Sequence, residues 1–391
     1  MRILFDLKSP QHFIGGCSEY IRKVFYSLIN EIRRSGIDVE LIGLTDSRIG
    51  HFANAELAPE TIKEYDVKIV DIANSTLKEI LDKEKIDKVF IGGAQYWGEY
   101  DVENIKCPVV CVIHDLCDEE YDRNRLDEYF RLDKFNTYLR YKFHVWRNGK
   151  RRLEQNEKIF NMLRLNKEAQ IITVSNYSRN SIIYNYNIDI KKIKVLYSPE
   201  RITVKKEYIE NECLKKIIVE KRKYYLMLSA NRINKNPYKT IRAFKRYHDL
   251  YDEEALFITV GFPEKQYDSH IILPYLSESD LAYIMENCYA FVFPSYFEGF
   301  GYPPIEAMKY GKPVLCSNTT SIPEVCGDAA IYFSPYYETD IFSAFCKLNK
   351  SNYDKYSECV EKRWYDIQQR QEKDIETLIH MLLKDDNYNK L

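Results

Sequence analysis

The sequence predicts an α/β protein built from two doubly wound parallel sheets. Short apolar segments alternate with helical stretches along the whole chain, and several of these segments are continuous runs rich in Val and Ile. A strand that is apolar at every position is covered on both faces, which is typical of a parallel sheet between two helix layers. At 391 residues the chain is too long for one core of ordinary size. We therefore expect two domains that face each other across a cleft, with ligand-binding loops at the carboxyl ends of the strands.

The first half of the chain contains the first series of apolar runs. The expected strands are Arg2–Leu7, Val39–Thr45, Val67–Ile72, Lys88–Gly92, Val109–Asp115, Gln170–Ser175 and Ile193–Ser198. After the first run, apolar residues recur at Ile21, Val24, Phe25 and Leu28, a spacing that indicates a helix beginning near Gly16.

A second series of apolar runs begins at Tyr224. Its expected strands are Tyr224–Ala230, Ala255–Gly261, Ile271–Leu276, Tyr289–Phe293, Pro313–Ser317 and Ala329–Ser334. The charged stretch Pro199–Lys221 has little periodicity and predicts the join between the domains. We expect one Rossmann-like domain at 1–200 and a second Rossmann-like domain at 201–365. The stretch Trp364–Leu383 predicts a long helix, and residues 366–391 are expected to cross back onto the first domain.

Composition limits the class of protein. Hydrophobic residues make up 45% and charged residues 30%, which is typical of a globular chain, and the net charge of −2 gives no reason to expect nucleic acid. No apolar run approaches the length of a bilayer span, and the chain enters a strand directly from Met1. The ten cysteines include no CxxC pair, and no His/Cys spacing fits a metal. We expect a cytoplasmic protein with reduced thiols and no metal site.

The segment Phe293–Met308 is the most informative part of the sequence. An apolar run ends at Phe293, a loop with Gly299, Phe300 and Gly301 follows, and Pro303 and Pro304 open a helix. Glycines let backbone N–H groups approach a ligand, and a helix N-terminus carries partial positive charge, so this arrangement predicts an anion site.

Two carboxylates, Glu298 and Glu306, flank this predicted anion site. They would repel a phosphate, so they suit a ligand with hydroxyl groups on both sides of its phosphates. A nucleotide-sugar, with ribose at one end and a hexose at the other, has that layout. Alone, Glu298 could complement the helix dipole and Glu306 could be a solvated helix residue, but the apolar neighbours of Glu306 make a free carboxylate there costly.

The chain resembles the family-four retaining glycosyltransferases, which have the GT-B fold, and in particular their mannosyltransferase-like members. The resemblance extends over nearly the whole chain in the same order. It rests on the segments Gly15-Gly16 with Tyr20, Ile113–Leu116, Thr173–Ser178, Asn231–Asn236, Ala243-Phe244, Glu298–Met308, Gly311–Val314 and Ile322–Ala330. The most specific of these is the pair of glutamates with seven residues between them.

The resemblance implies that the domain at 1–200 binds the acceptor and that the domain at 201–365 binds the nucleotide-sugar. It also implies roles for individual residues: Glu298 would contact hydroxyls of the transferred sugar and Glu306 the ribose. His114 would lie beside the transferred sugar and help to position donor and acceptor. Gly15 and Gly16 would allow close approach to donor phosphate or acceptor, and they would equally serve a tight turn. A histidine at the end of a strand commonly has a structural role, so such a role remains an alternative for His114. Asp115 and Asp118 are further candidates for acceptor contacts.

Arg232 and Lys235 follow the first strand of the second series. Such a pair is usually a solvated turn. A diphosphate leaving group, however, carries about two negative charges that something cationic must stabilise as the bond breaks. The family more often has a longer gap between its Arg and Lys, so Lys235 is the firmer prediction of the two.

The stretch Lys134–Lys167 is basic, with ten Lys/Arg against two Glu and interleaved aromatic residues. It could be a solvated helix pair or a nucleic-acid surface. In a glycosyltransferase it fits attachment to an anionic membrane surface, where lipid-linked acceptors lie.

The function implied is metal-independent, retaining transfer of a hexose, with GDP-mannose as the first guess for the donor, to a hydroxyl of a glycan or lipid-linked acceptor in surface polysaccharide synthesis. No cofactor is expected beyond the nucleoside diphosphate sugar. The location would be cytoplasmic, at the inner face of the membrane. Two alternatives remain: a nucleotide-sugar epimerase of the same architecture, and a non-catalytic GT-B partner subunit.

Overall fold

The computed structural model describes residues 1–12, 15–50, 55–120, 135–201, 208–262, 265 and 267–384. For residues 118, 135–148 and 233 only the backbone is described. The chain divides into two compact units. The first comprises Met1–Glu120, Leu139–Ile202 and Arg370–Leu391, and the second consists mainly of Thr203–Gln369.

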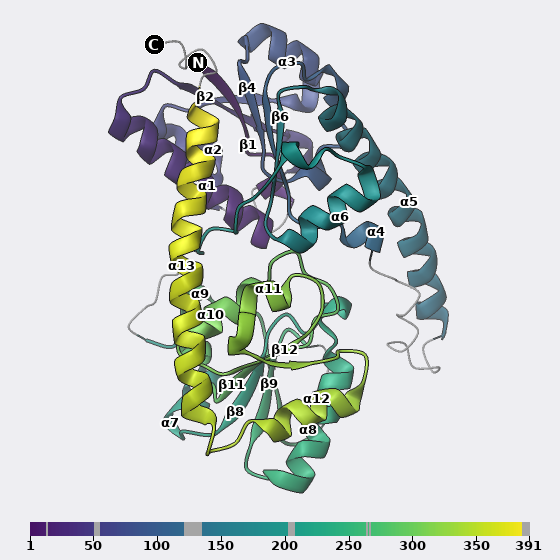
Figure 1. The fold of residues 1–391 in the computed structure, drawn as a ribbon, viewed down its shortest axis with the longest axis vertical. Coiled ribbons are helices and arrows are strands. Elements are labelled where there is room, and N and C mark those ends of the chain that lie inside the picture. The colour runs from purple at the N-terminus through teal and green to yellow at the C-terminus, as the bar shows by residue number, and fades with distance from the viewer. Residues whose placement is uncertain are drawn as a thin grey trace. The chain divides into compact units, whose positions relative to one another are not determined.

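Each strand that the sequence predicts is present, mostly with shorter bounds (Figure 1). The first unit contains β1 (Arg2–Asp6), β2 (Glu40–Thr45), β3 (Lys68–Asp71), β4 (Lys88–Ile91), β5 (Val109–Ile113), β6 (Ala169–Thr173) and β7 (Ile193–Val195). The second contains β8 (Tyr224–Met227), β9 (Leu256–Val260), β10 (His270–Leu273), β11 (Ala290–Phe293), β12 (Val314–Ser317) and β13 (Ile331–Phe333).

The helices fill the intervals between the strands. They are α1 (Gly16–Ser35), α2 (Pro59–Ile62), α3 (Leu77–Glu84), α4 (Cys117–Glu120), α5 (Phe135–Leu165), α6 (Asn176–Tyr186), α7 (Glu212–Val219), α8 (Pro237–Tyr251), α9 (Glu278–Asn287), α10 (Tyr302–Lys309), α11 (Ile322–Cys326), α12 (Glu338–Lys347) and α13 (Tyr353–Leu383).

Both sheets are parallel in every strand pairing described. The first runs in the order β3-β2-β1-β4-β5-β6-β7 and the second in the order β10-β9-β8-β11-β12-β13. In each sheet the strand order reverses between the first strand of the series and the fourth, β1 and β4 or β8 and β11. Such a reversal leaves a crevice at the carboxyl ends of the two strands, where doubly wound proteins bind their ligands.

The first sheet is covered on both faces, as its continuous apolar strands require. Residues such as Leu4, Val109 and Ile171 pack with α3, α5 and α6 in one buried cluster. Their neighbours point to the other face, where the Phe5 ring meets Phe25 of α1 with centroids 5.5 Å apart. Each strand therefore contributes alternate residues to two cores.

The second sheet has the same three-layer construction. Leu226, Phe291 and Cys316 belong to one buried cluster with residues of α7, α9, α10 and α13. Tyr225 and Leu315 face the opposite cluster, which α8 and α12 cover, and Figure 1 shows these two helices lying together against that face.

Helix α13 is longer than the sequence predicts. It begins at Tyr353, not near Trp364, because Cys359 and Val360 already pack into the second unit's core and stabilise the earlier turns. Its residues from Arg370 onward belong to the first unit. There Asp374 Oδ2 accepts the Tyr197 N–H at 2.7 Å, and Lys88 Nζ donates to the carbonyls of Met381 and Leu382.

Candidate functional site

The second unit holds two charged groups at its strand-order reversal. β8 is followed by a turn ending in Lys235, and β11 is followed by the loop that carries Glu298. Because β8 and β11 are adjacent and parallel, the segments that leave their carboxyl ends meet at one edge of the sheet.

Lys235 and Glu298 form an ion pair at this edge, between Nζ and Oε1. Both side chains are largely buried, with 8% and 15% of their surface exposed. The ammonium also lies over the Phe293 ring, 4.6 Å from its centroid, an added cation–π attraction. A cation held in so little solvent interacts strongly with an incoming anion, and the carboxylate beside it remains an acceptor for hydroxyl groups.

Asn236 joins the two loops and fixes the direction of Lys235. It has a left-handed backbone (φ 56°) and precedes the first turn of α8. Its side-chain amide donates to Pro335 O at 2.8 Å, and its Oδ1 accepts the Tyr296 hydroxyl at 3.0 Å. The Tyr296 N–H in turn donates to Asn234 O at 2.8 Å. Asn236, the residue after Lys235, thus anchors this turn and thereby sets the position of the Lys235 ammonium.

The glycine loop after β11 ends at Gly301, which has a φ of +99° that side chains rarely adopt. Gly299 and Phe300 are buried, and α10 begins directly after Gly301. Pro303 and Pro304 have no N–H. Backbone donors at this helix end can therefore come only from Tyr302 and from the loop, which narrows the anion site that the sequence predicts to residues 299–302.

Glu306 lies in the second turn of α10 and is half-buried, with its Oε2 atom enclosed. Arg232 is exposed, and its carbonyl accepts the Lys235 N–H at 3.0 Å. The structure therefore brings Lys235 and Glu298 together, holds Glu306 one helical turn beyond the glycine loop, and leaves the Arg232 side chain outside the ion pair.

In the first unit, His114 follows β5. Its Nε2 lies 3.0 Å from Gly92 O, the residue after β4, and its ring packs edge-on against Tyr20 of α1 with centroids 5.0 Å apart. Burial lowers the pKa of His114 to about 4. The ring is therefore neutral near pH 7, and a carbonyl partner requires the proton on Nε2. This leaves Nδ1 as a hydrogen-bond acceptor.

Gly15 and Gly16 lie at the start of α1. Gly15 is extended, with a φ of −178°, so its backbone does not demand a glycine. Its N–H donates to Ser18 Oγ at 3.0 Å, which satisfies one donor of the helix end. Close approach of a ligand to these glycines remains a prediction.

Comparison with known proteins gives a family match within the second unit. Residues 210–362 match the model of the glycosyl transferases group 1 family, a segment that contains Lys235, Glu298 and Glu306. The match covers less than half of the chain. O-antigen chain mannosyltransferase B of Escherichia coli is 31% identical over 199 residues, which cover 44% of this chain and 49% of that protein. O-antigen chain mannosyltransferase RfbU of Salmonella typhimurium is 31% identical over 192 residues, covering 46% and 51%. The chain therefore spans about half the length of these curated relatives.

Solved structures resemble the protein over its whole length. A glycosyltransferase of Rickettsia africae has a TM-score of 0.63 at 16% identity, covering 98% of this chain and 99% of that one. Anabaena HepE, solved with UDP, has a TM-score of 0.66 at 14% identity with the same coverage. The lipopolysaccharide glycosyltransferase WaaG has a TM-score of 0.63 at 13% identity, covering 98% and 99%. At these identities the likeness concerns the fold, and it confirms the predicted GT-B class of two doubly wound units.

Two charged residues that the sequence analysis missed organise the first unit. Asp6 ends β1 fully buried, and its carboxylate accepts the N–H groups of Ser9, Gly92 and Gly93, the Ser9 hydroxyl and the Trp97 indole N–H. An acidic residue at the end of a buried strand was the available signal, because an ion there needs several donors.

Lys8, two residues later, is also fully buried. Its ammonium donates to Tyr96 O and lies 4.4 Å from the centroid of the Tyr100 ring. Burial lowers the pKa of Lys8 to about 8. Nothing in the sequence around Lys8 separates it from an exposed loop lysine.

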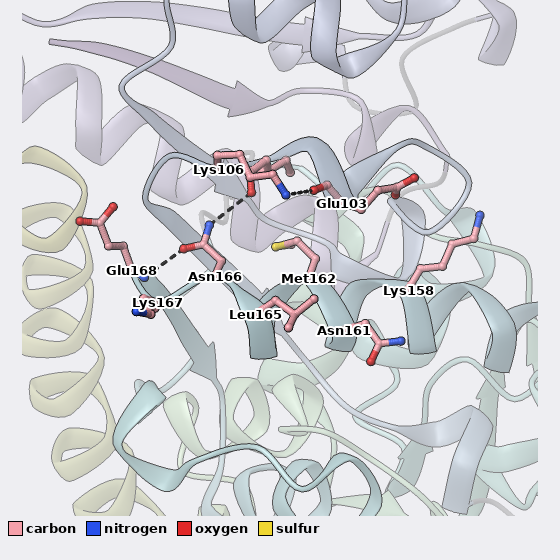
Figure 2. Close-up of a pocket in the computed structure, with 10 residues that line it drawn as sticks. Glu103, Lys106, Lys158, Asn161, Met162, Leu165, Asn166, Lys167 and Glu168 are labelled. Atoms are coloured by element: carbon pink, nitrogen blue, oxygen red, sulfur yellow. Dashed lines mark hydrogen bonds between the residues drawn. The ribbon is translucent and has the colours of Figure 1, made fainter.

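A cavity of about 690 Å³ lies elsewhere in the first unit (Figure 2). It opens where residues 103–106 precede β5 and residues 166–168 precede β6, at the amino ends of these strands. Its polar groups serve the fold: Lys106 Nζ donates to Glu103 O at 2.6 Å, and the Asn166 amide donates to Cys107 O at 2.9 Å. The cavity is therefore at the opposite edge of the sheet from His114 and is separate from the candidate site.

In the part of the chain that the structure describes, no group of three or more His, Cys, Asp or Glu side chains is arranged to hold a metal ion. No helix among these residues is long and apolar enough to cross a bilayer.

Proposed function

We propose that this protein transfers a hexose from a nucleoside diphosphate sugar to a hydroxyl acceptor, with retention of the anomeric configuration and without a metal. The observation that carries the proposal is the buried Lys235–Glu298 pair at the strand-order reversal of the second unit. A cation and a carboxylate on adjacent loops suit a ligand that places a diphosphate and sugar hydroxyls side by side.

Each charged group has a distinct task in this mechanism. Lys235 turns from Glu298 to the diphosphate and stabilises the charge that develops as the sugar–phosphate bond breaks. Glu298 accepts hydrogen bonds from the transferred sugar, and Glu306 from the ribose. Because no side chain is assigned as a nucleophile, the departing phosphate takes the proton of the acceptor hydroxyl on the same face of the transferred sugar. The protein positions the two substrates and stabilises the transition state.

The first unit, in this proposal, binds the acceptor. His114 is neutral, and its Nδ1 atom can accept a hydrogen bond from a sugar hydroxyl, since its Nε2–H is directed at Gly92 O. In the same unit, a ligand approaches Gly15 and Gly16 at the start of α1. In the second unit, the exposed side chain of Arg232 supplements Lys235.

The donor we propose is GDP-mannose, and the product a surface polysaccharide. The O-antigen mannosyltransferases of Escherichia coli and Salmonella typhimurium support this choice, because their similarity is at sequence level. Anabaena HepE, solved with UDP, is similar to this chain in fold alone. Its complex therefore supports a nucleoside diphosphate as part of the donor, but it does not indicate which base the donor carries.

The test is a panel of nucleotide-sugars, each added to purified protein in a thermal-shift measurement with free UDP and GDP as references. A ligand at 100 times its Kd stabilises the fold by about 2.7 kcal/mol, so the true donor raises the midpoint. Failure of every nucleotide and nucleotide-sugar to raise it would overturn the proposal.

Incubation with the selected donor alone then separates the alternatives. A transferase hydrolyses the donor slowly at most and needs an acceptor for turnover. An epimerase produces a new sugar nucleotide without acceptor, and a non-catalytic partner subunit neither hydrolyses nor transfers. The intact Lys235, Glu298 and Glu306 favour a catalytic chain over a subunit that lacks activity.

We also propose that the basic stretch Lys134–Lys167 contacts an anionic membrane surface. Lys134 and the side chains of residues 135–148 lie outside the described residues, so support comes from the remainder of α5. Lys150, Arg151 and Arg152 are exposed, and Leu153 beside them and Leu165 near the helix end expose apolar surface, 41% and 80%. Exposed apolar and basic side chains together are typical of interfacial helices.

Sedimentation with anionic vesicles tests the membrane proposal. Each basic side chain near such a surface contributes about 1 kcal/mol, so binding at low salt and release by Lys150→Ser, Arg151→Ser and Arg152→Ser together are expected. Donor hydrolysis by the triple variant should equal that of wild type. Wild-type protein that stays in the supernatant with anionic vesicles at low salt would contradict the idea.

A further inference from the structure

We propose that Ser295 is the positioning residue that keeps the Glu298 carboxylate in place while Lys235 is engaged by the donor's diphosphate. The inference rests on the proposed function, and it concerns a step that the function requires. Among the residues that the structure describes, Lys235 is one of two donors to Glu298 Oε1. When it turns to the phosphates, the carboxylate loses its cation and would be free to rotate unless another donor holds it.

Ser295 is placed to be that donor. It follows β11 by two residues, is fully buried, and its hydroxyl donates to the same Oε1 atom of Glu298. The carbonyls of Asn234 and Phe297 lie 3.1 and 3.2 Å from Ser295 Oγ. A hydroxyl has one proton, and an ionised acceptor makes the stronger bond, so the proton is directed to the carboxylate.

The backbone of the same loop is held from a different element. The segment Ser317–Ser321, after β12, supplies hydroxyl groups to both ends of the loop. Thr320 Oγ1 accepts the Glu298 N–H at 3.1 Å, and Ser321 Oγ donates to Glu298 O at 2.9 Å. Ser317 Oγ donates to Ser295 O at 2.6 Å, and Thr319 Oγ1 does so at 3.1 Å.

The two sets of contacts have separable effects. The hydroxyls of residues 317–321 fix where the loop backbone runs, whereas Ser295 acts on the carboxylate itself. A loss of Ser295 should therefore alter what Glu298 does to the sugar and leave the diphosphate contact of Lys235 unchanged. A loss of Ser317 should remove a buried hydroxyl of the same network without touching the carboxylate.

The experiment compares Ser295→Ala with Ser317→Ala, its matched control, since both serines are fully buried. A hydrogen bond to a charged group contributes about 1.5–3 kcal/mol, so Ser295→Ala should lower kcat with the saturating donor by about 10- to 100-fold. Ser317→Ala should stay within about threefold of wild type, because the Thr319 hydroxyl still donates to Ser295 O and holds the loop backbone. The affinity of both variants for the free nucleoside diphosphate, which has no sugar, should match wild type.

Non-additivity gives a readout that a structural role would not produce. If Ser295 acts through Glu298, adding Ser295→Ala to Glu298→Gln should lower kcat no further, whereas independent effects would multiply. Should Ser295→Ala fold poorly, Ser295→Cys leaves no cavity, adds only a little volume and replaces a strong donor by a weak one, and its kcat should fall in the same direction.

The outcomes separate this inference from the function on which it rests. A wild-type protein with no turnover on any donor contradicts the proposed function. A wild type that turns over while Ser295→Ala equals Ser317→Ala, or loses nucleoside diphosphate affinity in parallel with kcat, overturns the positioning role of Ser295.

Discussion

In both sheets, charged residues lie at the strand-order reversal, but the two units bind these charges differently. In the second unit, the Lys235 ammonium contacts the Glu298 carboxylate and the Phe293 ring, and the carboxylate also accepts one serine hydroxyl, so few contacts hold the pair together. In the first unit, Asp6 is bound by five donors and Lys8 by a carbonyl and aromatic rings, and neither side chain is exposed. His114, which lies next to that site, is neutral.

The difference indicates a division of labour. Charges that are already bound within the fold cannot be offered to a ligand without breaking several hydrogen bonds, so Asp6 and Lys8 are not available to a ligand. A single ion pair can be exchanged for an ion pair with a ligand at much lower cost. The second unit is therefore suited to a diphosphate, and variants at the two positions should fail in different ways.

Glu298→Gln should have the largest effect on turnover. The change keeps the volume and removes the charge that accepts hydrogen bonds from the sugar, a loss of about 3–4 kcal/mol in transition-state stabilisation, or a kcat lower by roughly 100- to 1,000-fold. Steady-state transfer assays measure it, with Glu338→Gln as the control, since Glu338 pairs with Arg242 on the surface of the same unit. Retention of more than half of the wild-type kcat would reject the assignment of Glu298.

Lys235→Ala should lower kcat/KM by about 100-fold, because the developing diphosphate charge loses its buried cation. Affinity for free UDP or GDP should fall as well, which calorimetry measures. Lys245→Ala, which removes an exposed partner of Asp249, should change neither. EDTA should leave wild-type activity unchanged, and strong EDTA inhibition that Mg²⁺ or Mn²⁺ reverses would show that a metal does the work assigned to Lys235.

Asp6→Asn should act on stability and not on donor affinity. The amide group would face donors that now share a carboxylate, which leaves buried N–H groups unsatisfied and lowers the free energy of unfolding by about 2 kcal/mol. Urea unfolding measures the loss, and the exposed Asp38→Asn on the same unit is the control. If Asp6→Asn instead weakened nucleoside diphosphate binding at unchanged stability, the contrast between the two units would be wrong.

The sequence was sufficient where a single residue pattern has one physical cause. Short apolar runs predicted the strands, and the glycine loop with its flanking carboxylates led to the prediction of Glu298, because few other structures need that pattern. Residues whose role depends on a partner far away in the chain were missed. Thr320 is an ordinary loop residue until folding brings the segments after β11 and β12 together, and Asp6 gains its donors from residues 9 to 97. Helix α13 was predicted to start too late because its first turns depend on packing, not on their own pattern.

The smallest effect concerns stability in mild acid, where one histidine from each sheet is compared. Burial lowers the pKa of both His114 and His270 to about 4, from an ordinary value of 6.5. Between these values the unfolded chain binds more protons than the folded protein, so stability is present near pH 7 and is lost as the pH falls toward 4. After allowance for solvent, each ring should account for roughly 1 kcal/mol of the loss between pH 7 and pH 5.

His114→Gln and His270→Gln separate the two contributions. Glutamine places an amide near the Nε2 position, which in His114 faces Gly92 O and in His270 faces Thr259 Oγ1, and it does not titrate. Urea unfolding at pH 7 and pH 5 should show a smaller acid loss for each variant. Transfer should then distinguish them: His270 lies in the edge strand β10, so His270→Gln should keep wild-type kcat, whereas His114→Gln should lower it. Equal kcat for both variants would mean that His114 is only a buried structural histidine, like His270, and that the acceptor hydroxyl is held by other groups of the first unit.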